Sequence, residues 1–361
     1  MTDPFTAVPG AVVDDGRLVH LGAPTTEQRS LAQGTAVAPL GDRSVLAVTG
    51  EDRLSWLDSL SSQALTALAA GESTELLILD PRGHVEHAAS VVDDGETTWL
   101  IADAPDAAGL LAWLTRMRFR LRVAPRDASD EVAVIGGTAA AVARAVPDAL
   151  AVWVDPWPQV GAGGWGYAPA EPHPGAERDW SEAIVPRAAL QRLADAAIAG
   201  EIALAGTLAA DALRVAAWRP RAVNEGGERT LPHEADWLRT AVHLNKGCYR
   251  GQETVAKVHN LGHPPRRLVA LQLDGSDAML PERGAAVRRD GDAIGEVTSV
   301  AHHYEEGPIA LAFVKRSVPL DAALTVDTPD GVIAAAQETI VPPDAGATAA
   351  VPRLPRLSRR R

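Results

Sequence analysis

Short hydrophobic runs separated by turn-forming residues dominate residues 44–103. Four runs rich in β-branched and aliphatic side chains predict strands at 44–50, 75–80, 84–92 and 97–103. The separators DPRG (80–83) and DDGE (93–96) favour tight turns. We therefore expect an antiparallel meander in this part of the chain.

Helical spacing follows the first of these strands. Thr49 with Asp52 resembles a capping box, which would start a helix at about Glu51. Leucines then recur about one helical turn apart and predict a stripe facing a core: Leu54, Leu57, Leu60, Leu65 and Leu68. Further helices are expected at 105–118, 186–198 and 207–217, the last capped by Thr207, with strands at 121–125, 131–137 and 150–155.

The pattern of hydrophobic and polar residues changes after Pro264 and Pro265. Short strands at regular spacing, separated by Gly/Asp turns, predict a small closed β unit. The last stretch, residues 342–361, is Pro-rich and basic and is expected to be a disordered tail. A solubilising end is favoured there over a nucleic-acid or membrane role, because blocks of charge are usually solvated.

Length and charge bound the function. A chain of 361 residues suggests two or three domains, since single cores rarely exceed about 250–300 residues. The net charge of −13 argues against broad binding to nucleic acid or to a membrane surface, which needs a positive face. We expect no membrane partner and no direct nucleic-acid partner.

A single cysteine, Cys248, excludes an internal disulfide framework and suits a reducing cytoplasm. Residues 1–16 show neither a basic nor an apolar signal region, so no secretory signal is expected. The chain has no run of about 18 apolar residues, so no transmembrane helix is expected.

The segment KGCYRGQE (246–253) holds this cysteine. Lys246 and Arg250 flank it, and a predicted helix begins a few residues later; both effects stabilise a thiolate, the nucleophilic and metal-binding form. Gly247 and Gly251 allow a tight turn or a close approach to another surface. If the thiol is exposed, the sequence predicts a reactive sulfur.

Other interpretations of these residues stay open. A lone cysteine is often a small buried hydrophobe. A zinc site is not expected, because one cysteine with scattered histidines lacks metal-ligand spacing. The nearby His243, His259 and His263 could act as bases or ligands, or as ordinary hydrogen-bonded histidines.

The run RTLPHEADWLRTAVHLNKGCYRGQETVAKVHN (229–260) resembles the signature region of the YgfZ family, folate-binding proteins related to the T-protein (aminomethyltransferase) of the glycine cleavage system. The octet matches K-G-C-Y-x-G-Q-E at all seven specified positions. GEDRLSWLDSLSSQAL, LILDPRGHVEH and AIGEVTSVAHHYEEGPIALAFVKR fit the same template, so the resemblance covers about residues 35–341.

The resemblance implies a three-domain α+β fold of the glycine cleavage T-protein type, with two interleaved α+β domains around a central hole and a C-terminal β-barrel. The corresponding boundaries are 1–50 with 130–245 for the first domain, 51–129 for the second, and 246–341 for the signature helix and barrel.

The resemblance also implies a folate-binding accessory protein for iron–sulfur cluster assembly or repair, with indirect effects on tRNA modification. Cys248 would be the thiolate ligand or redox handle. The rest of the motif corresponds to Lys246, Gly247, Tyr249, Gly251, Gln252 and Glu253. A cluster would be shared with an assembly protein or client iron–sulfur enzyme, a second copy or a small thiol, because clusters typically use about four protein ligands.

The expected folate positions depart from the T-protein pattern. Its relatives carry Arg-x-Glu-x-Gly, whereas Ala216 and Trp218 occupy the acidic and glycine places here. An unpaired pterin donor would cost about 1–3 kcal/mol. The remaining candidate contacts to tetrahydrofolate or a derivative are Glu86, His87, Arg214 and Arg221. For the two arginines, structural salt bridges are the alternative.

Two other functions compete with this one. The first is a tetrahydrofolate-dependent aminomethyl or methyl transferase, which needs an acid or base near the folate. The second is a thiol enzyme that uses Cys248 with His243 or His259 as its base.

Overall fold

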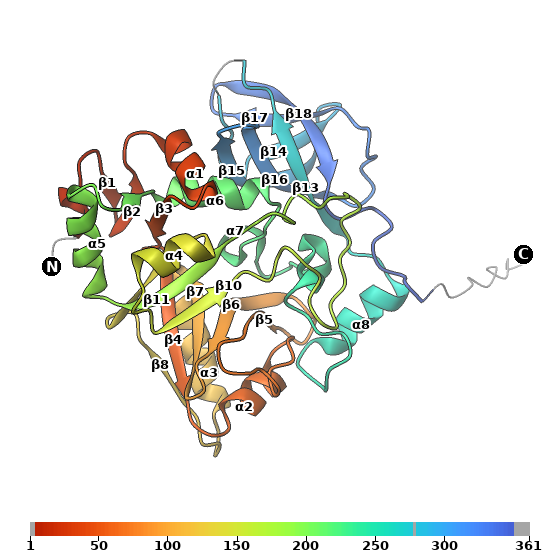
Figure 1. Cartoon of the computed structure of the whole chain (residues 1–361). Coiled ribbons are helices and arrows are strands. Elements are labelled where there is room, and N and C mark those ends of the chain that lie inside the picture. The colour runs from red at the N-terminus through yellow and green to blue at the C-terminus, as the bar shows by residue number, and fades with distance from the viewer. Residues whose placement is uncertain (1–3, 277–278, 350–361) are drawn as a thin grey trace, which may run out of the picture.

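The computed structural model describes residues 4–276 and 279–349 and shows two five-stranded open sheets, a small two-stranded sheet and a barrel (Figure 1). The first sheet has the order β10-β11-β9-β3-β12, in which β3 and β12 run parallel and the other pairs antiparallel. Its strands are β3 (Ala36–Pro39), β9 (Val132–Gly137), β10 (Ala151–Val154), β11 (Ser181–Pro186) and β12 (Ala203–Leu204).

Short elements surround this first sheet. At the N-terminal end these are η1 (Pro4–Ala7), β1 (Val12–Asp14), β2 (Arg17–His20) and α1 (Pro24–Ala32). The later ones are α4 (Ala139–Ala145), α5 (Ala189–Ile198) and α6 (Thr207–Ala216). Thr207 was expected to cap α6, but Gly206 holds the N-cap position and Thr207 is the first helical residue.

The second sheet contains the predicted three-stranded meander, extended on one side by two further strands. Its order is β5-β6-β7-β4-β8, and every pair is antiparallel. The strands are β4 (Arg43–Thr49), β5 (Ser73–Leu79), β6 (Val85–Asp93), β7 (Thr97–Asp103) and β8 (Ala124–Asp127), and the helices are α2 (Arg53–Leu60) and α3 (Ala104–Met117).

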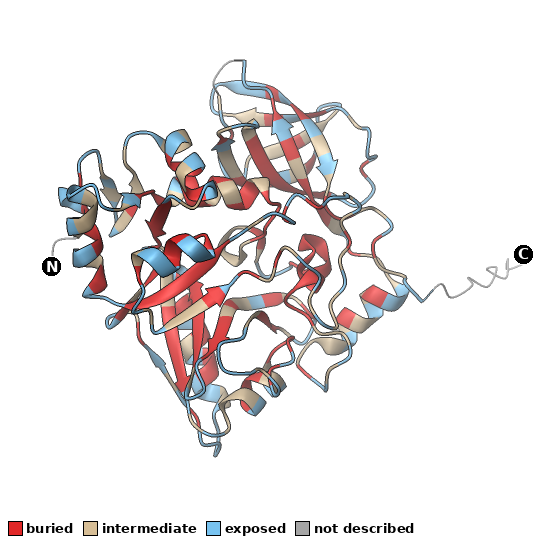
Figure 2. Ribbon diagram, in the orientation of Figure 1, coloured by how far each residue is buried: buried red, intermediate tan, exposed pale blue. Residues whose placement is uncertain are grey.

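Both faces of the central strands β4 and β7 of the second sheet are buried, as Figure 2 shows. On β4, Leu46 and Val48 pack with α2 and α3, whereas Val45 and Ala47 pack toward the first sheet. Side chains alternate between the faces of a strand, so burial on both sides requires an unbroken hydrophobic run. This explains why ELLIL and WLIA lack polar alternation.

The C-terminal part closes into a barrel with the order β13-β16-β15-β14-β17-β18, which confirms the predicted closed β unit. The strands are β13 (Arg266–Leu273), β14 (Ala286–Arg289), β15 (Asp292–His303), β16 (Gly307–Lys315), β17 (Leu324–Thr328) and β18 (Gly331–Thr339). Between the first sheet and the barrel lie α7 (Ala222–Glu225), η2 (Pro232–Ala235), η3 (Trp237–Arg239) and α8 (Gln252–Leu261).

Two details of the sequence analysis need correction. The change from one sheet to the other occurs at residues 40–42, before β4, whereas the expected domain limit was residue 50; β4 pairs with β7 and β8. The helix expected near Glu51 begins at Arg53 and ends at Leu60, so the later leucines of the stripe lie outside it.

The sequence analysis placed the start of the disordered tail too early, at residue 342. The backbone N–H groups of Thr348 and Ala349 donate to the carbonyls of His259 and Asn260, and the Thr348 hydroxyl also donates to His259. Residues 342–349 therefore cap the C-terminal carbonyls of α8, which otherwise lack intrahelical donors. The remainder of the expected tail, 350–361, lies outside the described residues. Within the described ranges, no helix combines the length and apolarity needed to span a membrane.

Candidate functional site

Cys248 is exposed, in the loop that leads into α8. The alternative of a buried small hydrophobe is therefore wrong. The predicted helix QETVAKVH is also confirmed, since α8 begins at Gln252. What holds the thiol in place is the rest of the motif.

Lys246 anchors the loop that carries Cys248. Its side chain is 3% exposed, and its ammonium group donates to the carbonyls of Ser61 at 3.0 Å and Gln63 at 2.7 Å and to that of Asp58. Burial lowers the pKa of Lys246, although the Asp58 carboxylate opposes this. The sequence predicted that this cation stabilises a Cys248 thiolate; its hydrogen bonds go instead to the end of α2 and the residues that follow it.

Arg250 ties the other side of the loop to the second sheet. Its guanidinium makes a bidentate pair with Glu86 of β6, at 2.6 and 3.2 Å, with both side chains about one-third exposed. Glu86, expected to contact folate, is thus the partner of Arg250, which occupies the unspecified position of the motif. The geometry of the pair is the strong, planar kind that guanidinium and carboxylate favour.

Glycine is required at position 251 because the backbone there lies close to the backbone of Asp80 and Gly83. Its φ is +85°, and a Cβ there would lie 2.7 Å from the carbonyl oxygen of Asp80 and 3.0 Å from the Cα of Gly83. Gly247 has open space around it. Gly251 therefore lets the start of α8 rest on the β5–β6 turn, as the sequence suggested for one of the two glycines.

The remaining motif residues brace the same loop. The Gln252 amide donates to the carbonyl of Lys246 at 3.3 Å, and Tyr249 is buried, with Lys246 Nζ 5.5 Å from the centre of its ring. Burial raises the pKa of Tyr249. Glu253 is exposed in the first turn of α8, where a carboxylate suits the helix dipole. Together the motif presents one exposed thiol on a fixed loop.

The histidines proposed as bases have other partners. His259 is buried and its Nδ1 lies 3.1 Å from the Tyr167 hydroxyl, while His243 Nδ1 accepts from the Asn245 N–H at 3.3 Å. His263 Nδ1 lies 2.8 Å from the carbonyl oxygen of Ala345. Among the described contacts none joins these rings to Cys248, so the geometry does not support the thiol-enzyme alternative.

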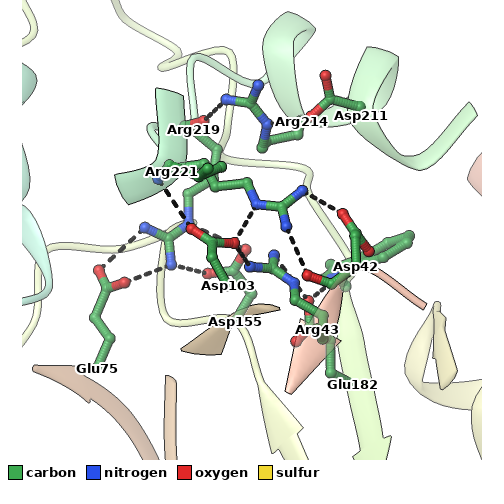
Figure 3. Close-up of polar contacts among 12 residues, drawn as sticks. Asp42, Arg43, Glu75, Asp103, Asp155, Glu182, Asp211, Arg214, Arg219 and Arg221 are labelled. Carbon is green, nitrogen blue, oxygen red and sulfur yellow. Dashed lines mark hydrogen bonds and ion pairs between the residues drawn. The ribbon is translucent and has the colours of Figure 1, made fainter. Parts of the chain in front are cut away.

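A second candidate site is a cavity of about 80 Å³ between the two sheets, lined by charged side chains. Figure 3 shows the ion pairs and hydrogen bonds that connect many of these side chains. Five arginines and six carboxylates line it: Arg43, Arg178, Arg214, Arg219 and Arg221, with Asp42, Glu75, Asp103, Asp155, Glu182 and Asp211.

Arg219 joins the two sheets across this cavity. It makes a bidentate pair with Glu75 of β5, at 3.1 and 2.6 Å, and reaches Asp155, which follows β10, at 3.2 Å. Asp155 also pairs with Arg178 at 2.9 Å. Burial alone would raise the pKa of Asp155, but Arg219 and Arg178 outweigh it and the pKa lies below its usual value.

Arg221 makes a second crossing. It contacts Asp42 and Asp103, each at 2.5 Å, and Asp103 also pairs with Arg43 at 2.6 Å. Burial opposes ionisation of Asp103, but the two arginines hold its pKa below the usual value. Arg221 was an expected folate contact; it lines the cavity, but its guanidinium is already paired.

Arg214 links the cavity to the barrel. It donates to Ser299 of β15 at 2.8 Å, to the carbonyl of Arg219 at 2.7 Å and to Asp211 at 2.6 Å. Arg214, an expected folate contact, lines the cavity but is buried among protein partners. The salt-bridge alternative holds for both Arg214 and Arg221.

The other expected folate positions lie elsewhere. His87 Nδ1 is 2.6 Å from Asp106 of α3, on the helix-covered face of the sheet, whereas Ala88 and Ser90 line the cavity. Side chains alternate along β6, so His87 points away from it. Ala216 and Trp218 line a different hollow, against the barrel.

These residues do not fit a folate as they stand. Small-molecule sites usually measure about 300–1,000 Å³, far more than this cavity, and admitting a pterin would separate buried ion pairs at a cost of about 3–5 kcal/mol each. Two acceptors are free, since Asp42 Oδ1 and Glu182 Oε2 are buried without a partner within the described residues. Together with the volume, they suit a few water molecules.

Sequence reasoning missed most of this network. Asp42, Glu75, Asp103, Asp155 and Arg219 come from five separate segments, and no local motif connects them. The available signal was a charged residue at the end of an otherwise apolar strand, as with Glu75 before LLIL and Asp103 after TTWLIA.

Comparison with known proteins agrees with the architecture. Residues 266–342 match the family described as the glycine cleavage T-protein C-terminal barrel domain. The crystal structure of the glycine cleavage system aminomethyltransferase T from Bartonella henselae superposes with a TM-score of 0.69, at 18% identity, over 92% of this chain and 93% of that one. The chain has the glycine cleavage T-protein fold. This confirms the predicted α+β class with its C-terminal barrel.

A curated relative of this T-protein-like chain is a chloroplastic "putative transferase" of Arabidopsis thaliana. It is 31% identical over 112 residues, which are 31% of this chain and 25% of that protein. The match therefore spans a quarter of the relative's length.

Proposed function

We propose that this T-protein-like chain is an accessory protein for iron–sulfur cluster assembly or repair that uses Cys248 as a thiolate ligand or redox handle. The observation that carries the proposal is an exposed thiol on a loop braced by Lys246, Arg250 and Gly251. Such bracing serves a partner that must meet the sulfur at a defined place.

The iron–sulfur part of the proposal rests on the resemblance of KGCYRGQE to the YgfZ signature. One thiol does not complete a cluster site, because clusters typically use about four protein ligands. Within the described residues, no group of three or more His, Cys, Asp or Glu side chains could hold a metal ion. A cluster would therefore be shared with an assembly protein, a client enzyme, a second copy or a small thiol.

The same proposal places the protein in the cytoplasm, where a single cysteine stays reduced. Effects on tRNA modification would be indirect, through modifying enzymes that contain iron–sulfur clusters. The acidic balance of the chain, −13, fits protein clients better than nucleic acid.

The shared fold supports a folate-type ligand such as tetrahydrofolate, but the ion-paired cavity leaves no room for one. We therefore assign no step to folate. The second candidate function is a tetrahydrofolate-dependent transferase. The shared fold supports it, but the free oxygens of Asp42 and Glu182 lie in the cavity that is too small for a pterin.

The test replaces Cys248 with Ser or Ala in cells. Activity of client iron–sulfur enzymes should fall to the level of cells lacking the protein, while the unfolding midpoint stays the same because the residue is exposed. The control is Asn260→Ala, an exposed change on α8. Normal client activity in both Cys248 variants would refute the proposal.

A second assay separates the transferase candidate. Purified protein is mixed with tetrahydrofolate and an aminomethyl donor, and methylenetetrahydrofolate is measured. Turnover that survives in Cys248→Ala would put the transferase first. Absence of turnover, with loss of client activity in the cells, is the result that we expect.

A further inference from the structure

The turn between α3 and β8 has an unusual surface. Residues 116–122, Arg-Met-Arg-Phe-Arg-Leu-Arg, which we call the arginine tip, alternate cations with apolar side chains. Phe119 is 79% exposed and Leu121 is 42% exposed. Residues 107–126 contain no acidic side chain, in a chain whose net charge is −13. A basic and apolar surface on an acidic protein calls for an explanation.

Helix stability explains only part of the arginine tip. Arg116 lies in the last turn of α3 and Arg118 is its C-cap, where cations favour the helix dipole. Phe119 gains nothing from this. Its φ of +46° is left-handed, which is uncommon for a bulky residue, and the turn closes with Leu121 N–H donating to the Arg118 carbonyl at 3.1 Å. The turn therefore keeps the aromatic ring of Phe119 exposed to solvent.

Most of the cations at the arginine tip are unpaired. Arg122 pairs with Glu51 and Asp52 at the start of α2. The guanidinium groups of Arg116, Arg118 and Arg120 have neither an ion pair nor a hydrogen bond to any residue that the structure describes. An exposed aromatic ring and three free arginines in one turn have the composition of an interface anchor, in which Arg and aromatic side chains are enriched.

The arginine tip is also close to the thiol loop. Arg122 N–H donates to Asp52 at 2.8 Å at the N-terminal end of α2, and Lys246 contacts Ser61 at the C-terminal end. Helix α2 has eight residues, which at about 1.5 Å each span about 12 Å. Figure 1 shows α2 at the lower edge of the molecule, between the α3–β8 turn and the loop before α8. A partner bound at the arginine tip would be about one helix length from that loop.

We propose that the arginine tip is the docking site for an acidic protein partner, which inserts Phe119 into an apolar pocket and surrounds it with carboxylates that pair with Arg116, Arg118 and Arg120. This rests on the proposed function, because the partner would be the protein that meets Cys248. Charge complementarity steers such an encounter and the buried ring holds it.

A protein fits this surface better than the other anionic partners. Single-stranded nucleic acid binds in grooves with several stacking platforms, whereas the arginine tip is one turn with one aromatic ring. Firm binding to an anionic membrane needs a larger buried apolar area or a second anchor, and the remaining net-negative surface would oppose it.

The test uses fluorescence anisotropy with three probes at one salt concentration. These are a labelled 15-residue peptide of alternating glutamate and leucine, a 15-nucleotide oligouridylate, and vesicles with about one-third phosphatidylglycerol. The full chain should bind the peptide most tightly. Phe119→Asn, which suits a positive φ, and the double change Arg118→Ser with Arg120→Ser should each weaken peptide binding roughly tenfold.

The matched controls are Leu320→Asn, at an apolar residue that is 50% exposed, and Arg192→Ser, at an exposed arginine, and neither should change binding. Tighter tip-dependent binding of the oligonucleotide or vesicles, equal loss in the controls, or no peptide binding would overturn the proposal. Tip-dependent self-association, measured by sedimentation, would overturn it in favour of a second copy.

The same measurements in Cys248→Ser separate the two proposals. If Cys248→Ser leaves client activity normal and the variant still binds the peptide, the docking site is supported and only the iron–sulfur function is refuted. If Cys248→Ser loses client activity but the peptide shows no binding that depends on the arginine tip, the iron–sulfur function is supported and the docking site is refuted.

Discussion

The ammonium nitrogen of Lys246 lies 2.7 Å from the carbonyl oxygen of Gln63, beneath the loop that carries the single cysteine of the chain. A buried lysine that donates to three carbonyl groups is a structural clamp. The position of the thiol, two residues later, is therefore set by the end of α2 and the residues that follow it, almost 190 positions earlier in the chain.

Replacing this lysine should release the clamp. Lys246→Met keeps the length of the side chain but leaves the carbonyls of Asp58, Ser61 and Gln63 without their donor. We expect a loss of about 2–4 kcal/mol in the free energy of unfolding, measured with urea. Lys257→Met, an exposed change on α8, is the control and should stay within about 0.5 kcal/mol. Equal stability of both variants would contradict the clamp.

The ion pairs of the cavity make a second prediction. Arg219→Met leaves Glu75 and Asp155 with fewer partners in a buried site and should cost about 3–5 kcal/mol. Adding Glu75→Gln should restore part of this, because the uncompensated carboxylate is removed. A double-mutant cycle by urea unfolding measures the coupling. Additive effects would show that the two side chains do not act as a pair.

Local sequence patterns predicted the helices and strands. Contacts between residues far apart in the sequence decided which strands lie next to one another. The strands of the meander lie within two residues of their predicted ends, because an apolar run bounded by turn residues is a local signal. The assignment of β4 failed, since nothing in SVLAVTG states that its neighbours are β7 and β8.

The same limit applies to the candidate site. KGCYRGQE indicated a glycine-flanked thiol but left its exposure open, and the structure shows that Cys248 is exposed. The real partners of its cations, Glu86 for Arg250 and the end of α2 for Lys246, lie more than 160 residues away. The capping of α8 by Thr348 was hidden in the same way, inside a Pro-rich stretch that composition alone marks as disordered.

Asp236 predicts a pH dependence of stability. It is fully buried with Oδ2 unpartnered within the described residues, and burial raises its pKa to about 7, although the N–H of Tyr167 and the charge of Arg239 oppose this. The folded state therefore keeps a proton that the unfolded chain has released. Stability from this group is complete below about pH 4 and is lost as pH rises toward 7.

Asp236→Asn should remove that loss. The variant should be near wild type at pH 4 and more stable by on the order of 2–4 kcal/mol at pH 8, measured by urea unfolding at both values. Burial lowers the pKa of His233 to about 3, which costs stability as pH falls below about 6.5. This slope is common to both proteins and cancels in the difference. A difference independent of pH would contradict the raised pKa.

The two motif glycines give the sharpest comparison, because Gly251 packs against the backbone of another segment whereas Gly247 has open space around it. Gly251→Ala forces a Cβ to within 2.7 Å of the Asp80 carbonyl oxygen at a φ of +85°, and backbone cannot yield as a flexible side chain can. We expect a loss of about 2–4 kcal/mol, since left-handed strain of about 1–2 kcal/mol adds to the clash. Client activity should fall with it, because the start of α8 must move and carry Cys248 away from its place. Gly247→Ala meets nothing within 4 Å and should leave both urea stability and client activity unchanged. If instead Gly247→Ala abolished client activity while Gly251→Ala did not, the loop would act through contact at its outer surface, and its seating on the β5–β6 turn would be irrelevant to function.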